Sequence, residues 1–102
     1  MITVDTNPKS LGTLVLSKPH SFNFALTAGV DAITITKITA GCGSCTTASI
    51  DSALIAANTT ENFKVTFTPQ ALGETSKKVT VIYTENNIEN NIVLEFNATV
   101  IN

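Results

Sequence analysis

Hydrophobic and polar residues alternate along short segments of this chain, and turn residues separate the segments. The clearest alternation lies at residues 22–26, 63–67, 79–83 and 92–101, where every second side chain is aromatic or aliphatic. Alternate side chains of a β-strand share one face of the sheet, so these segments predict strands with one buried face. Seven or eight such strands at regular spacing predict an all-β protein with an immunoglobulin-like (Ig-like) antiparallel β-sandwich.

Weaker patterns predict the remaining strands. Residues 2–4 form a short first strand, and a second strand around Leu14 stops before Pro19. Residues 33–36 alternate again, and residues 37–38 then break the alternation, which predicts a β-bulge.

Turns and loops account for the other segments. Residues 50–57 are rich in Ala and Leu, but they are too short for a stable helix and lack a polar face. We expect a short strand and a crossing loop there. The other expected turns and loops are residues 28–31, 41–49, 58–61, 69–73 and 85–91.

The length of the chain fits one folding unit. A protein of 102 residues is large enough to bury its own core. We expect a single domain over residues 1–102, in which residues 1–18 are N-terminal strands or an arm.

The order of these segments resembles a known family. Phe22 and Phe24 precede a glycine-containing turn and an Ile-x-Ile strand, and then follow a Cys-Gly loop, a Phe-x-Val-x-Phe-x-Pro strand and a Leu-Gly turn. Over residues 20–100 this order resembles bacterial Ig-like domains of unknown function that are related to Hydin-type and major sperm protein domains. The resemblance implies a sandwich and no enzymatic activity. Ser44 is a departure, because the family usually has Cys-Gly-Cys-Thr, and residues 57–60 replace its usual Pro-Gly turn.

The two cysteines, Cys42 and Cys45, form a Cys-x-x-Cys motif with three readings. A redox pair needs a thiolate at a helix N-terminus, which the strand pattern does not provide. A tetrahedral zinc site needs four ligands, and only His20 stands beside the cysteines, so zinc would require a site shared between two chains. We favour a structural loop whose thiols are either reduced or joined in a short-range disulfide.

The other chemistry-bearing residues show no catalytic pattern. His20 is the only histidine, and the eight carboxylates are scattered rather than spaced as in a calcium loop. We expect most of them to be solvated turn residues, and we expect neither an enzyme nor a bound cofactor or metal.

Charge narrows the classes of partner. Charged residues make up 14% of the chain, against about 25% in an average protein, and the net charge is −2 with six Lys and no Arg. Because Arg supplies most bidentate contacts to bases and phosphates, we expect no nucleic-acid binding. No apolar run reaches the length of about 18 residues that spans a membrane, and residues 1–5 do not resemble a signal peptide.

These observations favour a non-enzymatic structural or interaction protein. We expect a bacteriophage virion component, made in the host cytoplasm, that decorates the capsid or accompanies the tail by adhering to other structural subunits in a repetitive assembly. The alternative is a bacterial Ig-like binding module, cytoplasmic or exported, in an envelope or filament assembly. Loops are the favoured contact regions. The candidate contact residues are Gly41, Gly43, Ser44, Thr46, Asn86, Asn87 and Asn90.

Overall fold

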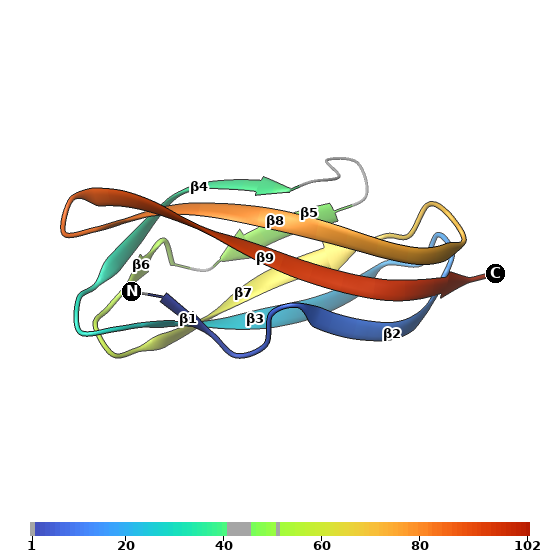
Figure 1. Cartoon of the computed structure of the whole chain (residues 1–102), viewed down its shortest axis with the longest axis horizontal. Coiled ribbons are helices and arrows are strands. Elements are labelled where there is room, and N and C mark those ends of the chain that lie inside the picture. Colours follow the sequence, from blue (N-terminus) through green and yellow to red (C-terminus); the bar gives the residue numbers. More distant parts are fainter. Residues whose placement is uncertain (1, 41–45, 51) are drawn as a thin grey trace.

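The structure is a computed structural model that describes residues 2–40, 46–50 and 52–102. Within these residues the chain forms nine strands and no helix, and the strands make two sheets that face each other (Figure 1). The first sheet has the order β1-β3-β7-β5, and the second has the order β2-β9-β8-β4-β6. The strands are β1 (Ile2–Val4), β2 (Lys9–Val15), β3 (His20–Ala28), β4 (Ile33–Ala40), β5 (Thr46–Ile50), β6 (Leu54–Ile55), β7 (Thr60–Phe67), β8 (Gly73–Glu85) and β9 (Ile88–Ile101).

The strand order is that of an immunoglobulin-like sandwich. Strands β1, β3, β7 and β5 correspond to the A, B, E and D strands of such a domain, and β4, β8 and β9 correspond to its C, F and G strands. The predicted all-β Ig-like sandwich is therefore confirmed. The described residues contain one strand more than the seven or eight expected, because β5 occupies part of a predicted loop.

One strand pair of the sandwich is parallel. β1 pairs antiparallel with β3 in the first sheet, whereas β2 pairs parallel with β9 in the second sheet. The chain crosses from one sheet to the other between β1 and β2. It therefore enters the second sheet beside β9 and runs in the same direction as that strand.

The alternating residues of the sequence form the core, as predicted. Phe24, Phe63 and Phe96 are fully buried, and the apolar residues that alternate along β7, β8 and β9 face the same interior. The ring of Phe96 in the second sheet meets the rings of Phe22 and Phe67 in the first sheet at centroid distances of 5.0 and 5.2 Å, both edge to face. Edge-to-face pairs of this kind add to the stabilisation that comes from removing apolar surface from water.

Two predictions about the middle of the chain are confirmed. The register of β4 against β8 shifts between Ile35 and Lys37, which is the expected bulge. In the segment 50–57 the described residues form no helix, and Leu54 and Ile55 make the short strand β6. Ile55 is fully buried against the sandwich, whereas Leu54 is 56% exposed.

The prediction of a loop over residues 41–49 is wrong for its second part. Residues 46–49 belong to β5, which pairs antiparallel with β7 at the edge of the first sheet. The Thr-Thr-Ala-Ser sequence of residues 46–49 alternates only weakly, and the neighbouring glycines and cysteines indicated a loop. Cross-strand pairing with the strongly alternating β7 supplies the order that the local sequence does not.

The expected loop over residues 85–91 is also wrong, because it is a two-residue turn. β8 runs to Glu85 and β9 begins at Ile88, and these two residues pair directly. Asn86 and Asn87 have φ angles of 53° and 63°, the left-handed conformation that a type I′ hairpin turn requires at both positions. Asn tolerates this conformation better than any other residue except Gly, so the Asn pair closes the longest hairpin of the fold.

The turn makes a testable prediction. Asn87→Gly should leave the free energy of unfolding nearly unchanged, because Gly adopts positive φ without strain. Asn87→Val should lower it by about 1–2 kcal/mol, since a β-branched residue is strained there. Urea denaturation of the two variants and the native chain measures the difference. Equal stability of the Gly and Val variants would contradict the type I′ assignment.

Candidate interaction surface

The structure separates the candidate contact residues into three groups. Gly41, Gly43, Ser44, Cys42 and Cys45 lie outside the described residues, so the disulfide and the contact role of this loop stay predictions. Thr46, the first residue of β5, is only 2% exposed, so it lies in the interior of the isolated chain and its contact role stays a prediction. Its position opposite Phe67 places it between the sheets.

The third group of candidate contact residues lies at the β8–β9 hairpin and consists of Asn86, Asn87 and Asn90. All three are exposed. Asn86 donates a hydrogen bond to the carboxylate of Asp31 at 3.0 Å, which ties the β8–β9 turn to the β3–β4 turn. Asn90 lies within β9 rather than in a loop. The residues are accessible, and they lie at the end of the paired β8–β9 hairpin.

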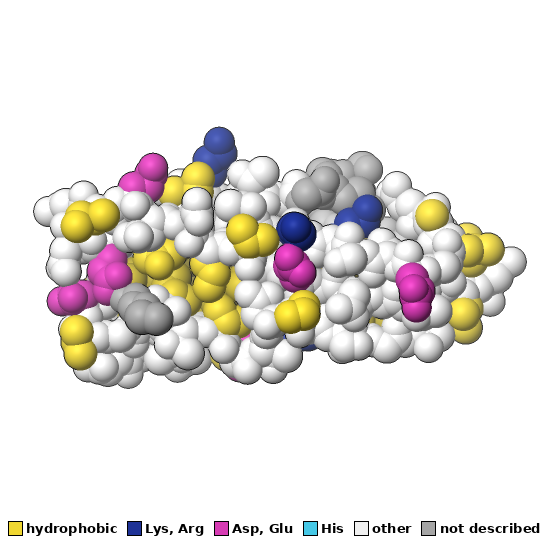
Figure 2. Space-filling model, in the orientation of Figure 1, with side chains coloured by type: hydrophobic (Ala, Val, Ile, Leu, Met, Phe, Trp, Pro, Cys, Tyr) yellow, Lys and Arg dark blue, Asp and Glu magenta, His cyan; other side chains and the backbone are white. Residues whose placement is uncertain are grey.

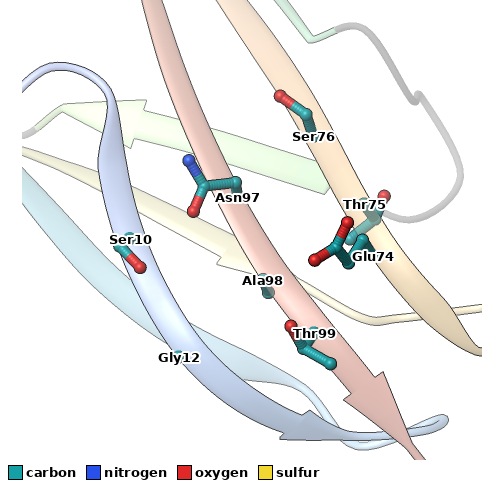
Figure 3. A pocket seen from close by; sticks show the side chains of 8 residues that line it. All are labelled: Ser10, Gly12, Glu74, Thr75, Ser76, Asn97, Ala98 and Thr99. Carbon is teal, nitrogen blue, oxygen red and sulfur yellow. The ribbon is translucent and has the colours of Figure 1, made fainter.

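A polar hollow of about 380 Å³ lies at the opposite end of the second sheet, where β9 passes between β2 and β8 (Figure 3). Gly12 opens it with a φ of 74°, at a bulge where three steps along β2, from Ser10 to Thr13, match two steps along β9. The lining residues are Ser10, Gly12, Glu74, Thr75, Ser76, Asn97, Ala98 and Thr99. Glu74 is the only titratable group among them, so the hollow offers hydrogen bonds but no pair of groups for acid–base catalysis.

An apolar row lies across the end of the same sheet. Val15 pairs with Ile101, and Gly73 pairs with Val100, so Leu72, in the turn just before β8, lies near Ile101. Val15, Ile101 and Leu72 are 41%, 47% and 57% exposed. Hydrophobic side chains are visible at this tip, beside the C-terminus (Figures 1 and 2). We refer to these three residues as the apolar row. It lies next to Glu74 and Thr99 of the polar hollow, so the two features form one surface.

The crossover between β1 and β2 is held by two polar side chains. Asp5 accepts a hydrogen bond from the backbone N–H of Ala25 at 2.9 Å and lies 3.5 Å from the ammonium of Lys9. Asn7 donates to the carbonyl of Val93 and accepts from the N–H of Glu95, both at 2.9 Å. The side-chain amide of Asn7 thus satisfies the edge of β9 in the place where a strand would pair with it.

Asp5 is exposed at the bend after β1, as the sequence suggested for most carboxylates, and its hydrogen bond makes its titration predictable. The hydrogen bond from Ala25, followed by the charge of Lys9, lowers the pKa of Asp5 below its ordinary value of 3.8. A lowered folded-state pKa contributes stability above the ordinary value, and this contribution is lost as the pH falls through the lower, folded-state pKa. Asp5→Asn should therefore be less stable than the native chain at neutral pH, and the gap should narrow below about pH 3.8. Urea midpoints across pH 2–7 test this, and a constant gap would contradict it.

The described residues show no cluster of metal-ligating side chains. None of them form a set of three or more His, Cys, Asp or Glu side chains near enough to hold a metal ion. His20 stacks against Phe22 at a centroid distance of 6.1 Å and therefore packs as an aromatic residue at the start of β3. In the described part of the chain, no helix is long and apolar enough to cross a membrane.

The fold and this surface define the protein as an Ig-like β-sandwich module. The chain belongs to a specific family, because the model of the family described as "Protein of unknown function (DUF1573)" matches residues 2–100. This match supports the resemblance to a domain family of unknown function that the sequence suggested. A search among curated proteins found no match.

Solved structures support the same fold. The VesB protease of Vibrio cholerae matches with a TM-score of 0.80 and 15% identity over 96% of this chain. A PapD-like domain of human CEP192 matches with a TM-score of 0.72 and 12% identity over 98% of this chain and 84% of that one. SSP-19, an MSP-domain protein of Caenorhabditis elegans, matches with a TM-score of 0.71 and 14% identity over 95% of this chain and 98% of that one. The chain corresponds to only 31% of the length of VesB.

Sequence reasoning did not find the surface that the structure shows. Gly12 inside a strand pattern was the available signal for a bulge and a nearby hollow. The apolar row had no such signal, because Val15, Leu72 and Ile101 are far apart in the sequence and each ends a different strand or turn. Only the pairing of three strands brings them together.

Proposed function

We propose that the chain is a non-enzymatic module that binds another protein through the outer face of its second sheet. The apolar row carries this proposal. Three large apolar side chains lie exposed, two of them on the adjacent strands β2 and β9 and the third in the turn before β8, beside a hollow lined by hydroxyls, an amide and a carboxylate. Apolar centres with polar margins are typical of protein–protein contacts.

We further propose that the partner is a structural subunit of a bacteriophage particle, to which the module adheres as a decoration or tail accessory. The low charge of the chain and its neutral polar surface support a role in a close-packed lattice. A rigid sandwich suits such a role, because a contact surface built on paired strands loses little conformational freedom on binding. In this setting the protein acts by adhesion and carries out no reaction.

Quantitative mass spectrometry of gradient-purified phage particles tests this proposal. The chain should co-purify at a fixed ratio to the major shell protein. Ile101→Lys should reduce its incorporation by about tenfold or more, because a charge would be buried in the contact. Val30→Lys is the matched control, since Val30 is 82% exposed on the β3–β4 turn at the other end of the sandwich. Absence of the chain from particles would end the virion proposal.

A second candidate is an exported or envelope-associated binding module of a bacterium. One comparison favours it: the same fold makes up about a third of VesB, a longer bacterial protease, and there it accompanies other parts of the chain. In this case fractionation of cells that express the protein should recover it with the envelope or with an extracellular assembly. Ile101→Lys should release it from that fraction, and Val30→Lys should not.

A further inference from the structure

The first part of β9 is an open strand edge. β9 contains 14 residues, but β2 pairs only with the part from Phe96 to Ile101. Asn7 occupies the next positions, at Val93 and Glu95. Before Val93, no described strand pairs with this side of β9, while β8 covers its other side along the whole hairpin.

The geometry identifies which backbone groups are available. The N–H and C=O of one strand residue point to the same side, and those of the next residue point to the other side. The carbonyl of Val93 and the N–H of Glu95 point away from β8, because they bond to Asn7. Glu89 and Asn91 have the same parity, so their N–H and C=O groups also point away from β8. The open edge therefore presents hydrogen-bond donors and acceptors at β-strand spacing.

Apolar surface lies beside this edge. Ile88 is 64% exposed, Val93 is 40% exposed, and Ile92 is only partly buried against the core. Figure 2 shows hydrophobic side chains at the surface in the half of the molecule where β9 begins, between that strand and β1 of Figure 1. Ile88 and Ile92 share one face of β9, so alternate side chains of a strand added at this edge would lie over them, whereas Val93 lies on the other face with Glu89.

The charges near the edge are negative. Glu89 is exposed on the edge strand itself, and Asp31 is held at the β8–β9 turn by Asn86. Lys78, the lysine nearest along the hairpin, already pairs with Glu95 at 3.5 Å. Lys37 lies on β4, which is on the far side of β8 from the edge.

We propose that the edge of β9 from Ile88 to Val93 binds an extended peptide segment of another protein, which adds to the second sheet as a further strand. Lysine or arginine residues at alternate positions of that segment would lie next to Glu89, and apolar residues at the other positions would cover Ile88 and Ile92. The backbone groups supply affinity and the side chains supply specificity. This adds a second surface, distinct from the apolar row.

A second copy of this chain is a poorer occupant. Antiparallel pairing of two β9 edges would bring the Glu89 side chains of both copies into one patch, and like charges across a strand pair are destabilising. Each copy also carries a net charge of −2. A basic partner segment meets the same edge with favourable charge.

Titration of the isotope-labelled chain with the probe peptide Lys-Val-Lys-Val-Lys-Val-Lys tests this inference by NMR. The amide signals of Glu89, Asn91 and Val93 should shift, and the exchange of these amides with solvent should slow. The matched peptide Glu-Val-Glu-Val-Glu-Val-Glu should bind about tenfold more weakly or worse.

Three variants sharpen the test. Asn91→Pro removes an N–H that points away from β8, so it should preserve the hairpin and weaken peptide binding by about tenfold or more. Glu89→Lys should weaken binding of the lysine-containing peptide through the change of charge alone. Glu74→Lys, on β8 in the polar hollow, is the charge control and should leave binding unchanged. Thermal unfolding of each variant establishes that it is folded.

Three results would overturn the inference. The first is an absence of amide shifts at millimolar peptide concentration. The second is shifts confined to the polar hollow, together with weaker peptide binding by Glu74→Lys. The third is concentration-dependent broadening of the edge signals without peptide, which would assign the edge to contact with a second copy. These outcomes are separable from the proposed function. If Ile101→Lys loses incorporation while Asn91→Pro is fully incorporated, the apolar row is supported as the contact with the particle, and the edge of β9 takes no part in that contact.

Discussion

Replacing Phe96 with alanine should lower the free energy of unfolding by about 3–5 kcal/mol, the largest effect expected of any single change in this chain. Phe96 is fully buried in the middle of β9. Its ring meets those of Phe22 and Phe67 from the opposite sheet, so alanine would remove both edge-to-face contacts and leave a cavity between the sheets. Domains of this size are stable by about 5–15 kcal/mol, so the loss is a large fraction of the total.

Urea denaturation measured by circular dichroism checks this prediction. Val93→Ala is the matched control, because Val93 lies on the same strand, faces outward and is 40% exposed. It should cost less than about 1 kcal/mol. A loss below about 1.5 kcal/mol for Phe96→Ala would mean that the aromatic cluster repacks around the cavity and does not hold the sheets together.

Replacing Asn7 with alanine should lower the free energy of unfolding by about 1–3 kcal/mol, more than is usual for an exposed residue. The amide of Asn7 makes two hydrogen bonds to β9, and each such bond contributes about 0.5–1.5 kcal/mol. These bonds also start the pairing of β2 with β9, since Lys9 pairs with Phe96 two residues later. The variant should loosen the whole N-terminal crossover.

Hydrogen exchange separates this effect from a general loss of stability. The N–H of Glu95, which donates to Asn7, should exchange faster in Asn7→Ala under conditions where the N–H of Leu94 keeps its protection against β8. Thr6→Ala, at the neighbouring exposed position, is the control and should change neither stability nor exchange by a measurable amount. Unchanged protection at Glu95 in the Asn7 variant would contradict the bridging role of this side chain.

These results bear on function because the same residues shape the binding surfaces. Asn7 ends the open edge of β9 and also positions β2, whose bulge at Gly12 opens the polar hollow. A loosened crossover would therefore disturb the hollow and lengthen the open edge together. The two proposed surfaces lie at opposite ends of β9 and share this one strand as their support.

The alternation of apolar residues was enough to predict the core and the fold class. Phe24, Phe63 and Phe96 occupy the buried face that their spacing indicated, because strand periodicity depends only on local backbone geometry and on the need to bury apolar surface. The bulge in β4 was equally local, since the break in alternation at residues 37–38 has its counterpart in the register shift between Ile35 and Lys37. The family resemblance rests on the same local patterns.

Features that depend on pairing between distant segments were missed. The strand β5 has weak alternation of its own, and it forms because β7 offers it an edge. The polar residues after Asn86 and Asn87 suggested a longer loop, but they belong to β9 because they pair with β8. Asp5 and Asn7 looked like ordinary turn residues, because nothing nearby in the sequence indicates that their partners are Ala25 and Val93.

By itself the sequence determined an all-β sandwich, its buried faces and the kinds of residue that are available for chemistry, because these follow from composition and short-range periodicity. Only the tertiary structure decided where partners could bind. The apolar row, the polar hollow and the open edge of β9 each arise from strands far apart in the chain, and register and crossover decide which of their groups remain unpaired at the surface.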